Sequence, residues 1–401
     1  MNTTAASAAG RARSRLLEAF EGALGGALTW LSICVWTAGW GWNRLPLSGV
    51  SWHFFVDGTA ALFGGSGLHL YADHPDLQIG PLAFGVLEVL GPLPSGAQKA
   101  AAQLLMTAVA PLLLWLLAPL VPGDLPVRRL RLMLAGLVLA PVWTVLSVRW
   151  MHLEDVLALL LSVLAVRLVG LGRRDGGPDW AGPAAGLALG AAMTAKPWAI
   201  GFVPVLLALP LWSLVSGLVV AGVATLAGWG PFLLADGRTL DALRPPVGVS
   251  DSSGLWTLGY HGAVVPSWGR TAQLVGAPLA GLLAALRRRW PGVLLAAIAV
   301  RLALDPQDIA YYAAGAVVAA LVFDLLLSRR TIPWTALVTA VVLWQPFSED
   351  FAHRFTSEHG LNLWWFQHPG VVGTVHLIWS AAMVLLVVAA PARWLGTDAS
   401  R

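Results

Sequence analysis

Long apolar runs separated by short polar breaks dominate the chain. Many of them approach the length that a helix needs to cross a hydrocarbon core about 30 Å thick. They fall near residues 22–42, 98–120, 129–148, 151–170, 181–196, 197–211, 213–235, 271–286, 291–304, 309–327, 332–346 and 371–392. The pattern predicts an all-α integral membrane protein with about twelve transmembrane helices, folded as a single polytopic domain over residues 1–401.

One further apolar run, 77–93, is interrupted by glycines and prolines and contains Glu88. If it dips into the membrane and returns, all the arginine clusters lie on one side, which the positive-inside rule makes the cytoplasm. The clusters are Arg11, Arg13 and Arg15; Arg128, Arg129 and Arg131; Arg167, Arg173 and Arg174; Arg287, Arg288 and Arg289; Arg329 and Arg330; Arg393 and Arg401. Both termini are then cytoplasmic, and 43–97, 236–270 and 347–370 are outer loops.

Composition agrees with a membrane location. The chain is 57% hydrophobic and 11% charged, whereas about a quarter of the residues of a soluble domain are charged. The net charge of +4 needs no nucleic-acid partner, because the arginines mark the cytoplasmic side. We expect a multi-pass plasma-membrane protein surrounded by lipid, with its active face extracytoplasmic, where the longest loops lie.

Several kinds of chemistry lack sequence support. The lone Cys34 excludes a disulfide framework and a cysteine-based zinc site. Glycine loops of the Walker type, HExxH and GxSxG are absent from the sequence. No cofactor is therefore expected.

The first outer loop contains an amphipathic segment from Trp52 to Phe63 whose only charge is Asp57. Such a segment is expected to lie as an interfacial helix at the membrane surface. Headgroups and water could simply solvate Asp57. The aromatic residues and glycines around it favour a functional carboxylate instead.

This layout resembles that of the GT-C glycosyltransferases, which use polyprenyl-phosphate sugars as donors. Phe55-Val56-Asp57-Gly58, Leu68-His69-Leu70-Tyr71 and Gly80-Pro81-Leu82-Ala83-Phe84 are similar to the opening of the actinobacterial polyprenyl-phosphate-mannose mannosyltransferases, including those that elongate phosphatidylinositol mannosides. The resemblance covers most of the chain in layout. It implies inverting transfer of a sugar, most simply mannose, to a lipid-linked or cell-envelope glycan acceptor, with Asp57 as the general base.

A second group of polar residues, Arg149, His152, Glu154 and Asp155, lies at the outer junction of two apolar runs. His152 and Asp155 are three residues apart and share a helix face, while Glu154 points elsewhere. The mannosyltransferases more often carry Gly-Gln and Asn here. The group could bind sugar hydroxyls, supply catalytic acid/base residues in His152 and Asp155, or cap the helix.

Lys196 is one of two lysines in the chain and lies on the outer side, where cations are disfavoured. With Pro197 it resembles the Lys-Pro pair of the mannosyltransferases. An ammonium there could neutralise the leaving phosphate of a lipid phosphodiester. Alternatively, the side chain extends to phospholipid headgroups.

Later outer segments supply further candidates for binding donor or acceptor. These are His261, Arg270, Asp308, Tyr311, His353 and Arg354. Asp308 and Tyr311 stand where the mannosyltransferases tend to show Ser-Pro followed by paired histidines, and the 347–370 loop could supply a substitute. The dispersed histidines lack the tight spacing of a metal site, so no metal is assigned.

The leading hypothesis is therefore an outer-face glycosyltransferase. The alternative is a transporter or flippase of polyprenyl-linked or other amphiphilic solutes, for which Asp324 is the one acid well inside a late apolar run. The sequence shows no pair of matching broken helices, which weakens an inverted-repeat transporter. A scaffold subunit, the third alternative, would need neither Asp57 nor Lys196.

Overall fold

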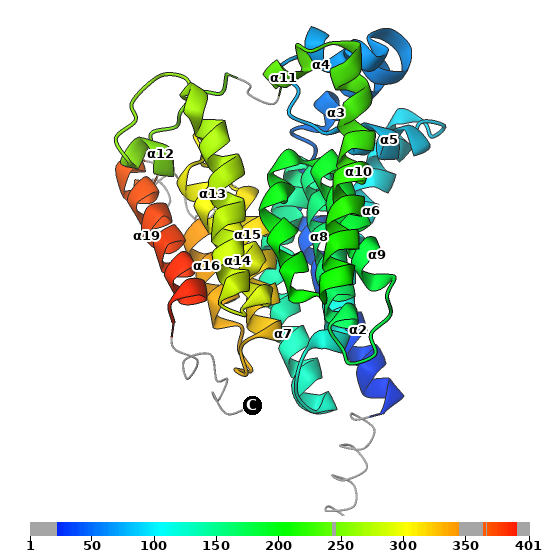
Figure 1. Ribbon diagram of the computed structural model, residues 1–401, viewed down its shortest axis with the longest axis vertical. Coiled ribbons are helices and arrows are strands. Elements are labelled where there is room, and N and C mark those ends of the chain that lie inside the picture. The colour runs from blue at the N-terminus through cyan, green and yellow to red at the C-terminus, as the bar shows by residue number, and fades with distance from the viewer. Residues whose placement is uncertain (1–21, 243–245, 345–363, 366, 391–401) are drawn as a thin grey trace, which may run out of the picture.

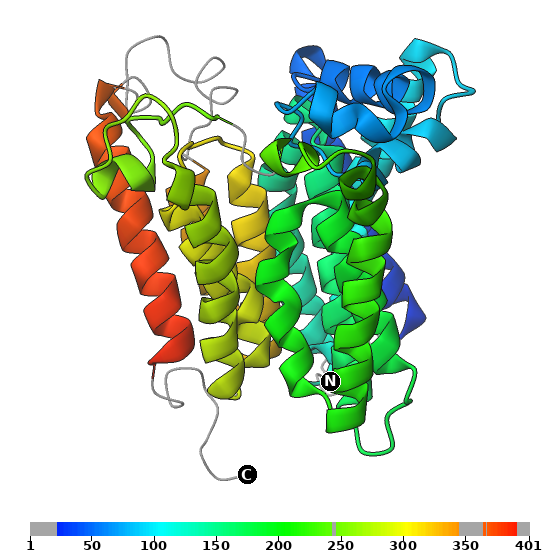
Figure 2. The ribbon, with the colours of Figure 1, turned by 45° about the horizontal axis from the view of Figure 1, so that its top comes forward.

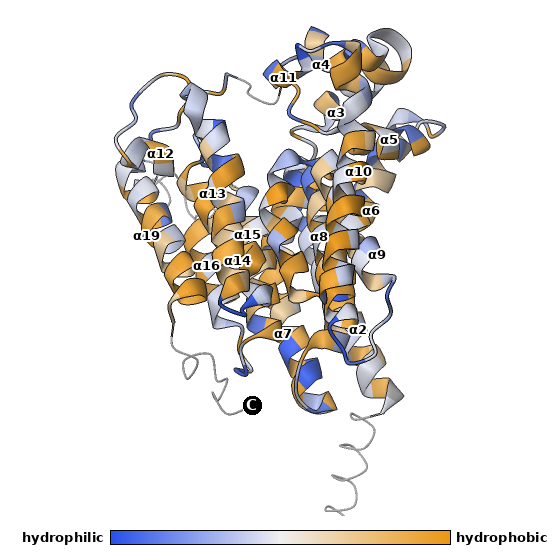
Figure 3. Ribbon diagram, in the orientation of Figure 1, coloured by the Kyte–Doolittle hydropathy of each residue, from blue (hydrophilic) through white to orange (hydrophobic). Residues whose placement is uncertain are grey.

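A computed structural model describes residues 22–242, 246–344, 364–365 and 367–390. The elements in these residues are helical, and the only β feature among them is an isolated bridge between Gly248 and Val264. The long helices form one bundle, and a group of short helices covers one of its ends (Figure 1). Hydrophobic residues cover the length of the bundle, while hydrophilic residues gather mainly towards its ends (Figure 3).

The bundle contains a helix for each of the twelve apolar runs. They are α2 (Ala23–Arg44), α6 (Ser95–Leu117), α7 (Leu125–Thr144), α8 (Leu153–Gly172), α9 (Ala181–Ala195), the 3-10 helix η6 (Pro197–Ala208), α10 (Leu211–Ala235), α13 (Ser267–Leu286), α14 (Val293–Ala303), α15 (Tyr312–Leu326), α16 (Trp334–Leu343) and α19 (Pro369–Val388). The helical assignment is confirmed.

Five of these helices, with their short 3-10 or π extensions, are long and apolar enough to cross a membrane. They are Ser95–Leu120, Leu125–Trp150, Leu153–Gly172, Leu211–Ala235 and Pro369–Val388. The shorter apolar helices have at most 15 residues, and at 1.5 Å per residue an α-helix of that length reaches only about 23 Å. A membrane protein is indicated, and twelve spans stay a prediction.

The run 77–93 forms only one short helix, α5 (Pro81–Val89), of nine residues. A nine-residue helix is about 13 Å long, less than half of the hydrocarbon core. It packs against α3 (Trp52–Ala60) and lies at the same end of the bundle as α4 (Leu70–Asp73) (Figures 1 and 2). Its length agrees with a run that does not cross the membrane.

Small residues bring α9 against α10. Gly182 and Gly186 are four residues apart, and a Cβ at either would collide with the backbone of Ser213 or Gly217 in α10. Small residues at this spacing let membrane helices approach closely. The contact fixes the end of α9, which is followed directly by Lys196.

A buried arginine ties α7 to the far end of α15. Arg131 donates to the backbone oxygens of Asp324, Leu325 and Ser328 at 2.7, 3.1 and 2.6 Å. The Asp324 carboxylate accepts the N–H of Ala336 in the first turn of α16, at 2.9 Å. Asp324 thus joins two helix ends, where unpaired backbone groups need partners.

Candidate functional site

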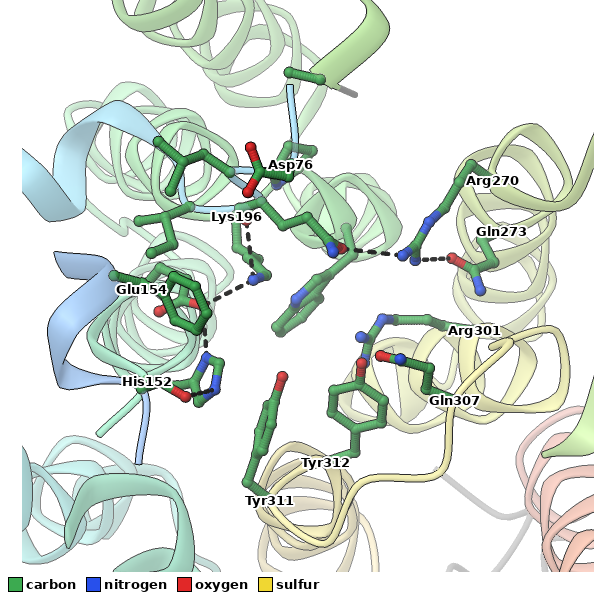
Figure 4. A pocket seen from close by; sticks show the side chains of 18 of the residues that line it. Asp76, His152, Glu154, Lys196, Arg270, Gln273, Arg301, Gln307, Tyr311 and Tyr312 are labelled. Carbon is green, nitrogen blue, oxygen red and sulfur yellow. Dashed lines mark hydrogen bonds and ion pairs between the residues drawn. The ribbon is translucent and has the colours of Figure 1, made fainter. Parts of the chain in front are cut away.

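A cavity of about 260 Å³ lies where the short helices meet the bundle. Side chains from several elements line it and point towards one another (Figure 4). The polar ones are Ser51, Asp76, Gln78, His152, Glu154, Lys196, Arg270, Gln273, Arg301, Gln307, Tyr311 and Tyr312. Polar groups from several elements therefore converge on a cavity whose remaining lining is apolar and aromatic.

The chain turn between α7 and α8 places His152 at the cavity. A π-helical segment, Val145–Trp150, ends α7, and Met151 then adopts a left-handed conformation with φ 58° and ψ 50° before α8 begins. That conformation costs a non-glycine residue about 1–2 kcal/mol. Met151 is fully buried, so tertiary packing holds the turn.

Backbone bonds bring the segment between α2 and α3 to the same place. The N–H groups of Val50 and Ser51 donate to the oxygens of Arg149 and Trp150, both at 3.0 Å. Gly49 precedes them with φ +83°, and a Cβ there would lie 2.6 Å from the Lys99 side chain. Ser51 is consequently fixed opposite His152.

His152 is hydrogen-bonded through both ring nitrogens. Its Nδ1 lies 2.8 Å from Oε1 of Glu154, and its Nε2 lies 3.0 Å from Oγ of Ser51. An ionised carboxylate only accepts, so Nδ1 carries a proton, and in the neutral form of the imidazole Nε2 is then the acceptor for the Ser51 hydroxyl. The imidazole also stacks on Tyr311, with ring centroids 3.9 Å apart.

Lys196 stabilises the Glu154 carboxylate. Its Nζ lies 2.8 Å from Oε1 of Glu154 and donates to the backbone oxygen of Gln78 at 3.1 Å. The Glu154 side chain is 0% exposed and that of Lys196 is 13% exposed. Because the ion pair is desolvated, each charge depends on the other.

The segment before α5 is held tightly beside Lys196. Tyr71 donates to the oxygen of Ile79 at 2.8 Å, and burial raises the pKa of Tyr71, which keeps its hydroxyl a donor. The N–H of Gly80 donates to the oxygen of Ala195 at 3.1 Å. A Cβ at Gly80 would collide with the oxygens of Thr194 and Ala195, so this approach requires glycine.

Arg270 lies on the opposite wall of the cavity (Figure 4). Its guanidinium donates to Oε1 of Gln273 at 3.0 Å and to Oε1 of Gln78 at 3.1 Å. Gln273 in turn donates to the oxygen of Leu304 at 2.8 Å. Arg270 thus links α13 to the segment before α5 across the cavity.

Arg301 lies at the cavity wall near the end of α14. Its guanidinium packs over the rings of Trp198 and Tyr312, at 5.1 and 4.7 Å, and lies 3.4 Å from the Asp305 carboxylate. Trp198 donates its indole N–H to Asp155 at 3.0 Å. Asp155 therefore contacts the Trp198 ring, which lines the cavity, but does not line the cavity itself.

One group of described residues could hold a divalent metal. His152, Glu154 and Asp155 each offer one ligand atom, and these atoms lie within 4.8 Å of one another. An imidazole with two carboxylates suits zinc or manganese. A metal there would compete with Lys196, whose ammonium already contacts Oε1 of Glu154.

The structure brings together five of the residues proposed from the sequence. His152, Glu154, Lys196, Arg270 and Tyr311 line the same cavity. A sixth, Asp155, lies 3.7 Å from Nδ1 of His152.

Asp57, by contrast, is exposed on α3 and does not line the cavity, although Phe54, one helical turn earlier, does. Its assignment as the base stays a prediction that the cavity geometry does not favour.

The other candidates lie elsewhere. Arg149 donates to the oxygen of Leu47 at 3.0 Å, and His261 is exposed and packs against Trp256. Asp308 lies 3.3 Å from His376 and lines a neighbouring cavity of about 20 Å³. The candidates His353 and Arg354 fall outside the described residues.

Sequence reasoning missed several residues that line the cavity. Among them are Ser51, Gln78, Trp229, Gln273 and Arg301. A signal existed for Arg301, because a cation inside an apolar helix is costly and often functional. None existed for Gln78 or Gln273, which are placed only by contacts between distant segments.

An apolar groove of about 360 Å³ adjoins this site. It is formed by η6, α10 and α13, and Leu274 lines both the groove and the polar cavity. The other lining residues are Val203, Pro204, Leu207, Leu214, Leu218, Val275, Pro278, Leu279 and Leu282. A molecule with a polar head and a hydrocarbon tail matches this pair of spaces.

Comparisons of the whole chain with protein-family models, with curated proteins and with solved structures find no match.

Proposed function

We propose that the chain is a membrane glycosyltransferase that moves a sugar, mannose in the simplest case, from a polyprenyl-phosphate donor to a hydroxyl of a lipid-linked or cell-envelope acceptor. One observation carries the proposal. A single cavity combines an imidazole oriented by a carboxylate, His152 with Glu154, and the ammonium of Lys196. These are the base and the cation that transfer from a phosphodiester needs.

His152 is the base in this proposal. Its Nε2 accepts from Ser51 at rest, and an acceptor hydroxyl that takes the place of the Ser51 hydroxyl would donate to the same nitrogen. As the acceptor oxygen attacks the anomeric carbon, its proton passes to Nε2. The bond from that carbon to the phosphate oxygen breaks, and the phosphate keeps the electron pair. A single displacement inverts the anomeric centre.

The leaving phosphate gains negative charge, which cations can stabilise. An ammonium has three N–H donors. Among the described residues Lys196 uses two of them, for Glu154 and Gln78, which leaves one for a phosphate oxygen. Arg270 lies across the cavity and offers further N–H donors. The prenyl tail would follow the apolar groove beside Leu274.

The test uses the purified full chain in detergent, with polyprenyl-phosphate mannose labelled in the sugar and an extract of envelope lipids. We expect labelled glycolipid and free polyprenyl phosphate to form in equal amounts. A sugar nucleotide in place of the lipid donor should give no product. If the lipid donor is not consumed with any acceptor fraction, the proposal is rejected.

The same donor distinguishes the transporter. In sealed vesicles a flippase would move the intact lipid between leaflets without releasing polyprenyl phosphate. Asp324, the acid proposed for a transport path, accepts the N–H of Ala336 and lies at the α15–α16 connection. That contact gives Asp324 a structural role, so the position of this acid does not support a transport path.

A further inference from the structure

Ser51, His152 and Glu154 form a hydrogen-bonded chain in which each group prepares the next. Oγ of Ser51 lies 3.0 Å from Nε2 of His152, and Nδ1 lies 2.8 Å from Oε1 of Glu154. This order of hydroxyl, imidazole and carboxylate is the one that activates a nucleophilic serine, and it is recognised by geometry and not by sequence order.

The proton positions suit nucleophilic attack. Glu154 is buried and paired with Lys196, so it remains a carboxylate and accepts the proton of Nδ1. Nε2 is left as the acceptor that faces the Ser51 hydroxyl. A fixed negative charge behind the ring also stabilises the imidazolium that forms when Nε2 takes the serine proton.

Both partners are fixed before any substrate arrives. Ser51 is held by its backbone bond to Trp150. His152 follows the left-handed turn at Met151 and stacks on Tyr311. Such positioning lowers the entropy lost in reaching the reactive geometry.

We propose that Ser51 is an activated nucleophile that accepts an acyl group from a membrane-lipid ester, an acyl-transfer activity separate from sugar transfer. The ester class follows from the two adjoining spaces. The cavity offers N–H donors from Lys196 and Arg270 to a carbonyl oxygen, and the groove beyond Leu274 is lined by apolar residues that suit an acyl chain.

The reaction balances without a further reagent. Oγ of Ser51 attacks the carbonyl carbon while its proton passes to Nε2 of His152. The ester C–O bond breaks, the alcohol leaves with the proton from Nε2, and the acyl group stays on Ser51 as an ester. A second alcohol or water then attacks that ester, and its proton returns to Ser51 through His152.

An alkyl fluorophosphonate tests the serine directly, because Oγ displaces fluoride and the phosphonate remains attached. The purified full chain in detergent is treated with the probe, and the adduct is located by peptide mass spectrometry. We expect one adduct per chain, on Ser51. Loss of the imidazole typically costs nucleophilic serines a hundredfold or more in rate, so His152→Gln should be labelled at least about a hundredfold more slowly.

Two further variants sharpen the result. Ser51→Ala should take no label, whereas Ser267→Ala, which removes an exposed serine at the start of α13, should be labelled like the wild type. A p-nitrophenyl ester of a medium-chain acid should release a burst of nitrophenol equal to the protein concentration. The proposal is overturned if native protein reacts no faster than heat-unfolded protein, or if the adduct maps to another residue. Neither result would bear on sugar transfer, which is measured separately.

Discussion

The ammonium of Lys196 lies 2.8 Å from Oε1 of Glu154, a carboxylate that is completely buried in the first turn of α8. The pair joins α8 to the α9–η6 junction across 42 residues of sequence. Glu154 also orients His152, so the same ion pair supports both the fold and the base. Lys196, one of only two lysines in the sequence, thereby has a structural reason for its position.

Removing the ammonium of Lys196 should destabilise the fold. A buried charge that loses its partner typically destabilises a protein by about 3–5 kcal/mol. We expect Lys196→Ala to lower the free energy of unfolding in mild detergent by an amount of this order. Lys99→Ala is the matched control, because Lys99 is partly buried and its one described bond, 3.2 Å to the oxygen of Ser48, is to a neutral group. That control should lose about 1 kcal/mol or less.

A double variant separates the pair from packing. Lys196→Met with Glu154→Gln replaces both charges by neutral groups of similar size, so it leaves no unpaired ion. It should recover more than half of the stability that Lys196→Met alone loses. If the single and double variants are equally unstable, the pair contributes nothing and packing explains the loss.

Gly80 provides a test of how closely the segment before α5 approaches α9. A Cβ there would collide with backbone oxygens of Thr194 and Ala195, which cannot rotate away. Overpacking of this kind typically costs about 1–3 kcal/mol. We expect Gly80→Ala to lower the unfolding free energy within that range and to reduce sugar transfer, because the loop beside Lys196 must move.

The control for Gly80 is Gly85, five residues further along and inside α5. A Cβ at Gly85 would meet nothing within 4 Å, and alanine favours a helix over glycine by about 1 kcal/mol. Gly85→Ala should therefore leave the unfolding free energy unchanged or raise it slightly. Equal destabilisation by both substitutions would contradict the close approach at Gly80.

The helices were predictable because each is encoded locally. An apolar run of sufficient length is enough to place a helix, and the runs from 98 to 120 and from 213 to 235 correspond to α6 and α10 within a few residues. The arginine clusters predicted that the run 77–93 does not cross, and the nine residues of α5 agree with that prediction. What the runs do not encode is which helices pack together, and therefore which polar ends share a cavity.

The site was only partly predictable for that reason. His152 and Lys196 could be identified because each is an unusual polar residue at the end of an apolar run. The roles of Ser51 and Gln78 come from contacts with segments more than 100 residues away. Helical spacing placed Glu154 on a different face from His152, yet both contact the same site, because His152 precedes the helix and follows a left-handed turn.

The orientation of the chain in the membrane can be tested by labelling single cysteines in a Cys34→Ser background. Pro94→Cys follows α5 at an exposed position, and a run that does not cross should leave it reactive towards an impermeant maleimide added from outside. Asp175→Cys, exposed in the connection after α8, should react only after the membrane is opened. Protection of position 94 from the outer reagent would place α5 on the other side and reverse the assignment.

His152 and Asp57 are the two candidates for the general base, and variants of each can distinguish them. His152 lines the cavity and its Nε2 contacts the Ser51 hydroxyl there, whereas Asp57 is exposed on α3 and does not line the cavity. General-base catalysis typically contributes a hundred- to ten-thousandfold in rate. His152→Gln should therefore reduce kcat for sugar transfer by about a hundredfold or more, while KM for the lipid donor changes little.

Asp57→Asn is the matched comparison, since it keeps the size of the side chain and removes its basicity. Because Asp57 does not line the cavity, we expect this variant to keep more than about a tenth of the wild-type kcat. Removal of a general base would reduce kcat by more than that. Both variants must first match the wild type in gel filtration and in thermal unfolding, so that a loss of fold is not mistaken for a loss of chemistry. If Asp57→Asn falls at least a hundredfold while His152→Gln stays active, the acceptor hydroxyl approaches from the α3 side and Asp57 is the base, as the resemblance to the mannosyltransferases implies. If kcat falls to the same extent in both variants, His152 and Asp57 act on the acceptor proton in one step. The double variant should then be no slower than either single variant.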